Sequence, residues 1–137
     1  MRLLLDTNVV LDVLAHREPF FEDSWAIMDL KLDSRLELLV SASQITDVYY
    51  SLRKEFERSE DRLDKIRALR RTVKIVDATD EHIGIALDSH LGDFEDAVVD
   101  AVAWRHGADY IITRNAWDFQ GSRVPALTTS GFLEGIQ

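Results

Sequence analysis

The sequence contains no cysteine and only two prolines and six glycines among its 137 residues. Without cysteine there is no disulfide framework, no zinc–thiolate site and no thiol nucleophile. No uncharged run approaches the roughly 18 residues that a membrane-spanning helix needs, and no cationic segment followed by a long apolar run marks a signal peptide. These absences predict a soluble cytoplasmic protein without a membrane partner. The length predicts a single domain over residues 1–137.

Basic residues are scarce over most of the chain, and the net charge of −9 argues against a nucleic-acid surface spread over the whole molecule. Nine of the sixteen lysines and arginines nevertheless lie between Arg53 and Lys74, and no lysine follows Lys74. Acids alternate with them, as is typical of a solvated helical face with charge pairs. The alternative is a local basic surface, on which Arg70 and Arg71 are expected to meet a nucleic acid.

Short apolar segments alternate with segments of helical periodicity. Strands are predicted over residues 2–5, 36–41, 73–76 and 110–113, with a fifth near 126–129. Helices are predicted over residues 8–15, 19–32, 44–56, 59–71, 80–91 and 94–106. Short apolar strands separated by helices indicate a parallel sheet that is covered on both faces. The predicted fold class is therefore α/β, a three-layer α/β/α sandwich with a parallel sheet of four to five strands.

Polar residues gather where this fold brings functional groups together, beyond the carboxyl ends of the strands. Asp6 ends the first strand, and Asp47 lies one turn into the helix after the second. Asp96 lies in the first turn of the helix over residues 94–106, and Asn115 and Asp118 follow the fourth strand. Singly, each could be a helix cap, a first-turn acid or a surface charge. Together they predict one polar site at the edge of the sheet.

An all-oxygen cluster of this kind predicts a divalent metal ion. Two carboxylates 4 Å apart repel by about 4 kcal/mol at an effective dielectric constant near 20, so a cluster of them needs protons or cations. Oxygen ligands without histidine or cysteine suit Mg²⁺ or Mn²⁺ better than Zn²⁺. Such an ion can activate water and stabilise charge on a phosphodiester. Asp6 at the end of its strand is therefore expected to hold metal.

Three segments of the chain resemble the PIN domain, in the branch that includes the VapC-type toxins of toxin–antitoxin pairs. They are "LLLDTNVVLDVL" (residues 3–14), "SASQITDVYYSLRK" (residues 41–54) and "DFEDAVVDAVAWRHGADYIITRNAWDF" (residues 93–119). The resemblance runs over nearly the whole chain. It implies an α/β/α fold and a Mg²⁺- or Mn²⁺-dependent endoribonuclease that cleaves RNA with metal-activated water. It also implies a homodimer and a cognate antitoxin protein as partner.

The resemblance implies roles for individual residues. It places the first metal-binding acid at Asp6 and the third at Asp96. It assigns the polar loop after the fourth strand to Asn115 and Asp118. Asn8 and Thr113 match neighbouring polar positions that would orient the ligands, and they complete the candidate site as supporting residues.

The sequence departs from the family pattern at two positions. The second acid is usually glutamate, whereas here it is Asp47, which is one methylene shorter and is expected to act through a water molecule. The fourth position is often aspartate, whereas here it is Asn115, a neutral ligand that would weaken metal binding, with Asp118 as the compensating acid. These departures keep open an alternative function, a catalytically weak or inactive PIN scaffold that binds RNA or a protein partner.

A phosphoryl-transfer function is less consistent with the sequence. A phosphatase of the haloacid dehalogenase type needs a second aspartate two residues after the first, where this chain has Asn8. Both phosphatases and receiver domains of this architecture also use a late lysine, and none follows Lys74. Two further residues are assigned ordinary roles: Asp12 is expected to point away from the site, and Trp117 to serve in packing rather than in base stacking.

Overall fold

The computed structural model describes residues 1–135, and five strands of these residues form one parallel sheet. The strand order is β3-β2-β1-β4-β5, so β1 is the central strand. Leu4 of β1 is in register with Leu39 on one side and with Ile111 on the other. Asp6 therefore leaves the sheet at the middle of its carboxyl edge. The strands are β1 (Arg2–Leu5), β2 (Glu37–Ser41), β3 (Lys74–Val76), β4 (Tyr110–Thr113) and β5 (Ala126–Thr128).

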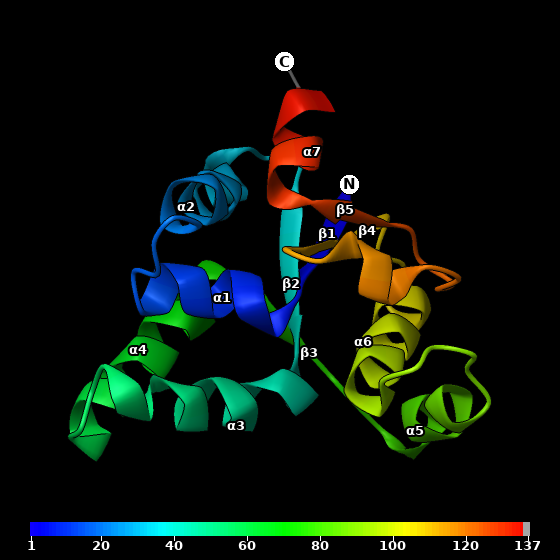
Figure 1. The fold of residues 1–137 in the computed structure, drawn as a ribbon, viewed down its shortest axis with the longest axis horizontal. Helices are drawn as coiled ribbons and strands as arrows, with labels where there is room; N and C mark the ends of the chain where they lie inside the picture. Colours follow the sequence, from blue (N-terminus) through cyan, green and yellow to red (C-terminus); the bar gives the residue numbers. More distant parts are fainter. Residues whose placement is uncertain (136–137) are drawn as a thin grey trace.

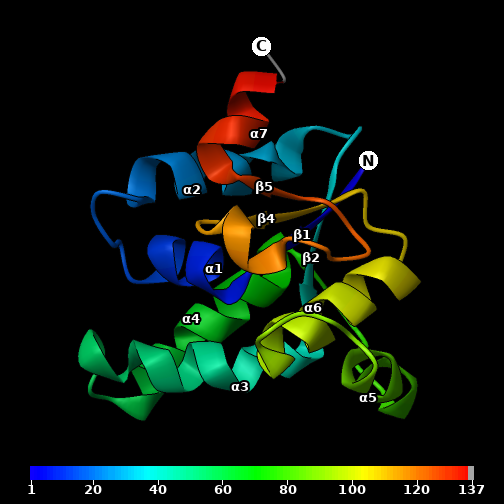
Figure 2. The ribbon, with the colours of Figure 1, turned by 45° about the vertical axis from the view of Figure 1, so that its right-hand side comes forward.

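Helices cover both faces of the sheet, which confirms the predicted α/β/α sandwich (Figures 1 and 2). One face packs against α1 (Thr7–Leu14), α2 (Phe21–Asp29), α3 (Ala42–Ser51), α4 (Ser59–Thr72) and α7 (Thr129–Gly135). The other packs against α5 (Asp80–Leu87) and α6 (Phe94–Arg105). Three short 3₁₀ helices are η1 (Leu30–Leu32), η2 (Leu52–Lys54) and η3 (Ala116–Phe119). Within residues 1–135, no helix is long and apolar enough to cross a membrane.

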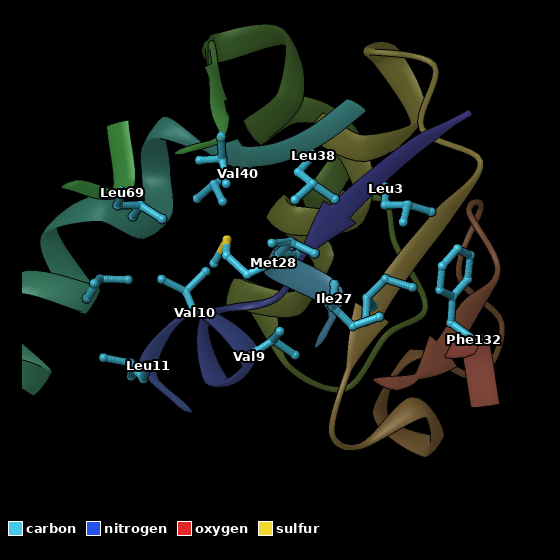
Figure 3. Packing of buried hydrophobic residues seen from close by; sticks show 14 of the residues in the cluster. Leu3, Val9, Val10, Leu11, Ile27, Met28, Leu38, Val40, Leu69 and Phe132 are labelled. Carbon is cyan, nitrogen blue, oxygen red and sulfur yellow. The ribbon is translucent and has the colours of Figure 1, made fainter. Parts of the chain in front are cut away.

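The core is divided by the sheet into two layers, because successive side chains of a strand point to opposite faces. In β1, Leu3 and Leu5 belong to the cluster beneath α1 to α4, whereas Leu4 belongs to the cluster beneath α5 and α6. Figure 3 shows the first cluster, in which Val9 and Val10 of α1 lie among side chains of the strands and neighbouring helices. Burial on both faces explains why the strands are continuous apolar runs.

Several helix boundaries differ from those predicted. The helix after β2 begins at Ala42 instead of residue 44, because Ser41 caps it together with Gln44 in a capping box. The helix after β3 ends at Leu87 instead of residue 91. Helix α7 was not predicted, since its seven residues are too few to show a helical period. Burial of Phe132 in the core holds α7 in place.

Candidate active site

The central residue of the site is Asp6, which ends β1 and caps α1. Its Oδ1 accepts a hydrogen bond from the backbone N–H of Thr7 at 2.8 Å, so Asp6 is the N-cap and this helix begins one residue earlier than predicted. Its Oδ2 accepts from Thr113 Oγ1 at 2.8 Å and from Asn8 Nδ2 at 3.4 Å. The Asp6 carboxylate is only 7% exposed, so these donors fix its direction.

The loop after β4 continues the same hydrogen-bond network. Thr113 Oγ1 accepts from the backbone N–H of Asn115 at 3.2 Å, and Asn115 Nδ2 donates to Asp118 Oδ2 at 2.9 Å. A continuous path of hydrogen bonds thus joins Asp6 to Asp118. The structure brings five of the seven predicted site residues into this network. They are Asp6, Asn8, Thr113, Asn115 and Asp118.

Asp96 faces this network from the first turn of α6. The cap of that helix is Asp93, whose Oδ1 accepts from the backbone N–H of Asp96 at 3.1 Å. Burial raises the pKa of Asp96 to about 7, and the nearby carboxylates, first those of Asp6 and Asp93 and then that of Asp118, add to the rise. Burial also raises the pKa of Asp6, against the hydrogen bonds from Thr113 and Thr7. Negative charge therefore accumulates between β1 and α6.

Asp47 lies to one side of this network, in an open hollow of about 590 Å³ that Thr7 and Glu95 also line. Asp47 is exposed, and its carboxylate interacts electrostatically with that of Glu95. Partial burial raises the pKa of Glu95, and the charge of Asp47 raises it further. Glu95 is not among the predicted site residues, although its place beside Asp96 in the acidic run "DFED" could have indicated it. We name this cavity the α3 hollow.

Basic side chains line the same hollow opposite the acids. They are Arg17, Arg53 and Lys54. Arg70 and Arg71 line a separate hollow with Lys74, whose ammonium lies 3.8 Å from Glu37 at the first residue of β2. This second hollow is toward the amino end of the sheet, so only the first residues of the basic region adjoin the acids. Arg70 and Arg71 therefore lie away from the acids, and an RNA surface formed by them would not adjoin the site.

Two residues outside the predicted site differ from the expectations, and a third, Asp100, has a structural role. Asp12, expected to point away, is completely buried and lies 3.2 Å from Arg114. Trp117, expected in packing, is 74% exposed. Asp100 is buried and accepts hydrogen bonds from the backbone N–H groups of Arg123 and Val124, at 2.9 and 3.0 Å. Asp100 therefore serves the loop before β5 rather than the site.

The donor set suits a hard divalent cation. All the site's ligating atoms are oxygens, and burial together with neighbouring carboxylates raises the pKa of both Asp6 and Asp96, so a cation bound there would stabilise their charged forms. Among residues 1–135, no three histidine or acidic side chains lie close enough to hold an ion jointly. The two-acid set of Asp6 and Asp96 thus stays the predicted core of the metal site.

Comparison with known proteins agrees with this fold. The PIN domain family model matches residues 2–116, and the chain therefore belongs to the PIN domain family. It is similar to "Ribonuclease VapC1" of Aquifex aeolicus (strain VF5), with 25% identity over 138 residues that cover 97% of this chain and 94% of the relative.

Solved structures share the fold at lower sequence identity. VapBC2 from Rickettsia felis, bound to a DNA fragment from its promoter, superimposes with a TM-score of 0.72 at 13% identity, covering 93% of this chain and 98% of that chain. A toxin-antitoxin complex from Klebsiella pneumoniae gives a TM-score of 0.68 at 19% identity, covering 92% and 96%. These similarities confirm the PIN-like sheet order and helical layers.

Proposed function

We propose that the protein is a Mg²⁺- or Mn²⁺-dependent endoribonuclease and the toxin of a type II toxin–antitoxin pair. The observation that carries the proposal is the arrangement around Asp6. Its buried carboxylate is oriented by Thr113 and Asn8 and faces Asp96, whose pKa is raised to about 7. Membership of the PIN domain family and similarity to a protein named as a ribonuclease support the same reaction class.

Asp6 and Asp96 are the residues that would hold the metal ion. When bound, a divalent ion supplies a water molecule of lowered pKa and balances charge on the phosphodiester. The protein orients Asp6 through Thr113 Oγ1 and Asn8 Nδ2, at 2.8 and 3.4 Å. Asn115 Nδ2 donates a hydrogen bond to Asp118 Oδ2 at 2.9 Å, which holds a further carboxylate close enough to Asp96 to raise its pKa.

The α3 hollow supplies a binding surface for RNA beside these acids. Arg17, Arg53 and Lys54 line it, and they can contact backbone phosphates of a strand whose scissile bond lies at Asp6. Tyr50 lines the same hollow and is 56% exposed, while Trp117 of η3 is 74% exposed beside Asp118. The Trp117 ring is available as a stacking surface for an unpaired base, which favours a single-stranded substrate, whereas the Arg53 guanidinium lies 5.4 Å from the centre of the Tyr50 ring.

Two protein partners complete the proposal, an antitoxin and a second copy of this chain. Similarity to a structure named as a toxin-antitoxin complex supports the first. Exposed apolar side chains support the second, because Trp25 is 49% and Leu32 is 78% exposed. The predicted dimer surface comprises the helices that carry Trp25 and the Tyr49–Tyr50 pair.

RNA degradation by the purified protein tests the proposal. Single-stranded RNA should be cleaved with Mg²⁺ or Mn²⁺ and left intact with chelator. Asp6→Asn and Asp96→Asn should lose most of the activity, whereas Asp61→Asn, at an exposed acid in the first turn of α4, should keep it. Full activity in chelator, or equal loss in all three variants, would contradict the metal assignment. RNA that is bound but never cut would identify the inactive scaffold instead.

A further inference from the structure

An ion pair between α1 and the loop after β4 lies next to the proposed active site, with its aspartate fully buried and its arginine side chain 29% exposed. Asp12 is 0% exposed, and its Oδ2 lies 3.2 Å from Arg114 Nε. Ser24 Oγ of α2 donates a hydrogen bond to the same oxygen at 3.2 Å. The Arg114 guanidinium also lies 4.2 Å from the centre of the Phe20 ring. The side chain of Arg114 therefore extends from the site loop into the helical layer.

The backbone of Arg114 is attached to the same helix. Its N–H donates to Asn8 Oδ1 at 3.2 Å, and Asn8 and Asp12 are four residues apart, on one face of α1. Its chain neighbours are Thr113, which binds Asp6, and Asn115, which binds Asp118. One face of α1 thus fixes both the backbone and the side chain of the residue between two members of the site.

Stability alone does not account for this pair. Removing two charges from water costs about as much as their attraction returns, so a buried pair adds little net stability over apolar side chains. Neither Asp12 Oδ1 nor Arg114 Nε has a hydrogen-bond partner among the described residues, which adds to the cost. What the pair does provide is a defined position for the loop, because it links residue 114 to the helix that Asp6 caps.

We propose that Arg114 is a positioning residue, anchored by Asp12, that sets Asn115 and Asp118 relative to Asp6. This inference rests on the proposed ribonuclease function. Arg114 acts through its neighbours and does not contact RNA. Without its anchor the loop shifts, and a misplacement of 1 Å in a catalytic arrangement can cost about 100-fold in rate.

The kinetic test uses Asp12→Asn, which keeps the shape of the side chain and removes its charge. The matched control is Glu81→Gln, which unpairs an exposed arginine, Arg105, from its partner at 2.8 Å. For Asp12→Asn, kcat should fall about 10- to 100-fold while KM for single-stranded RNA stays within about twofold. The control should match wild type. Unchanged kcat, or a raised KM with unchanged kcat, would overturn the positioning role.

Nuclear magnetic resonance gives a second test that does not depend on activity. In ¹H–¹⁵N spectra, the side-chain amide of Asn115 and the backbone amide of Asp118 should shift or broaden in Asp12→Asn and not in Glu81→Gln. If Asp12→Asn does not fold, Asp12→Asn combined with Arg114→Met removes both charges at similar volume and should give the same spectral changes. The two proposals can fail separately. If wild type cleaves no RNA, the proposed function fails. If the Asn115 and Asp118 signals of Asp12→Asn match those of wild type, the positioning role fails, whether or not wild type cleaves RNA.

Discussion

Removing one charge from the acidic cluster should stabilise the metal-free protein. In Asp96→Asn the carboxylate that burial and its neighbours disfavour becomes neutral, and its volume is kept. Because the folded-state pKa of Asp96 is raised, folding favours its protonated form. The contribution of Asp96 to the stability of wild type should therefore be fully present below the ordinary pKa of 3.8 and should be lost as the pH rises to about 7. The advantage of Asp96→Asn should therefore be absent near pH 4 and complete above pH 7.

The pKa of Asp96 sets the size of this effect. A rise from 3.8 to about 7 corresponds to about 4 kcal/mol, and solvent screening of this partly exposed group reduces the expected gain to about 1–3 kcal/mol. Thermal unfolding in chelator should show a higher Tm for the variant, by several degrees. Addition of Mg²⁺ should stabilise wild type, by about 1.4 kcal/mol when its concentration is ten times Kd, and should hardly affect the variant.

The control for this measurement is Asp61→Asn, which removes an exposed first-turn acid from α4. Losing its interaction with the helix dipole should cost a few tenths of a kcal/mol, with no dependence on Mg²⁺. Two results together would contradict our assignment of the cluster: a Tm of Asp96→Asn in chelator below that of wild type, and a Tm of wild type that does not change with millimolar Mg²⁺. Asp96 would then interact only with the dipole of its own helix, as Asp61 does.

Three further predictions concern RNA binding, the loop before β5 and assembly. Charge reversal of Arg53 and Lys54 should weaken RNA binding and flatten its salt dependence, whereas reversal of Arg70 and Arg71 should do neither; equal salt slopes would contradict this difference. Asp100→Ala should lower the free energy of unfolding by about 2–4 kcal/mol, because one buried and one partly buried backbone N–H group lose a charged acceptor, and denaturant unfolding would measure it. Sedimentation at micromolar concentration should show a dimer, and a lone 15.7 kDa species would exclude it.

Much of the fold could be predicted because its signals are local. The run from Tyr110 to Thr113 is apolar and bounded by polar residues, and β4 has these bounds. The convergence of Asp6, Thr113 and Asn115 followed from the parallel sheet, since carboxyl ends of neighbouring strands share one edge. A family resemblance over most of the chain reinforced both inferences.

The remaining features depend on contacts between distant segments. Asp12 is the only polar residue in the second half of α1, a pattern that favours exposure. Asp12 is buried instead because it pairs with Arg114, which is far from it in the sequence. Glu95 joins the site only because α6 packs near Asp47 of α3. Trp117 was assigned to packing because large aromatic side chains are usually buried, whereas here the ring is exposed beside Asp118.

A crystal of the protein soaked in Mn²⁺ tests the central claim, that the carboxylates at the middle of the sheet edge form a divalent metal site. We expect a single dominant anomalous difference peak within ligating distance of both Asp6 and Asp96, and its loss in Asp6→Asn. The raised pKa values of these two acids, with burial as the leading cause, are the reason for the expectation. No peak between them at saturating Mn²⁺, or a peak that persists in Asp6→Asn, would contradict the account.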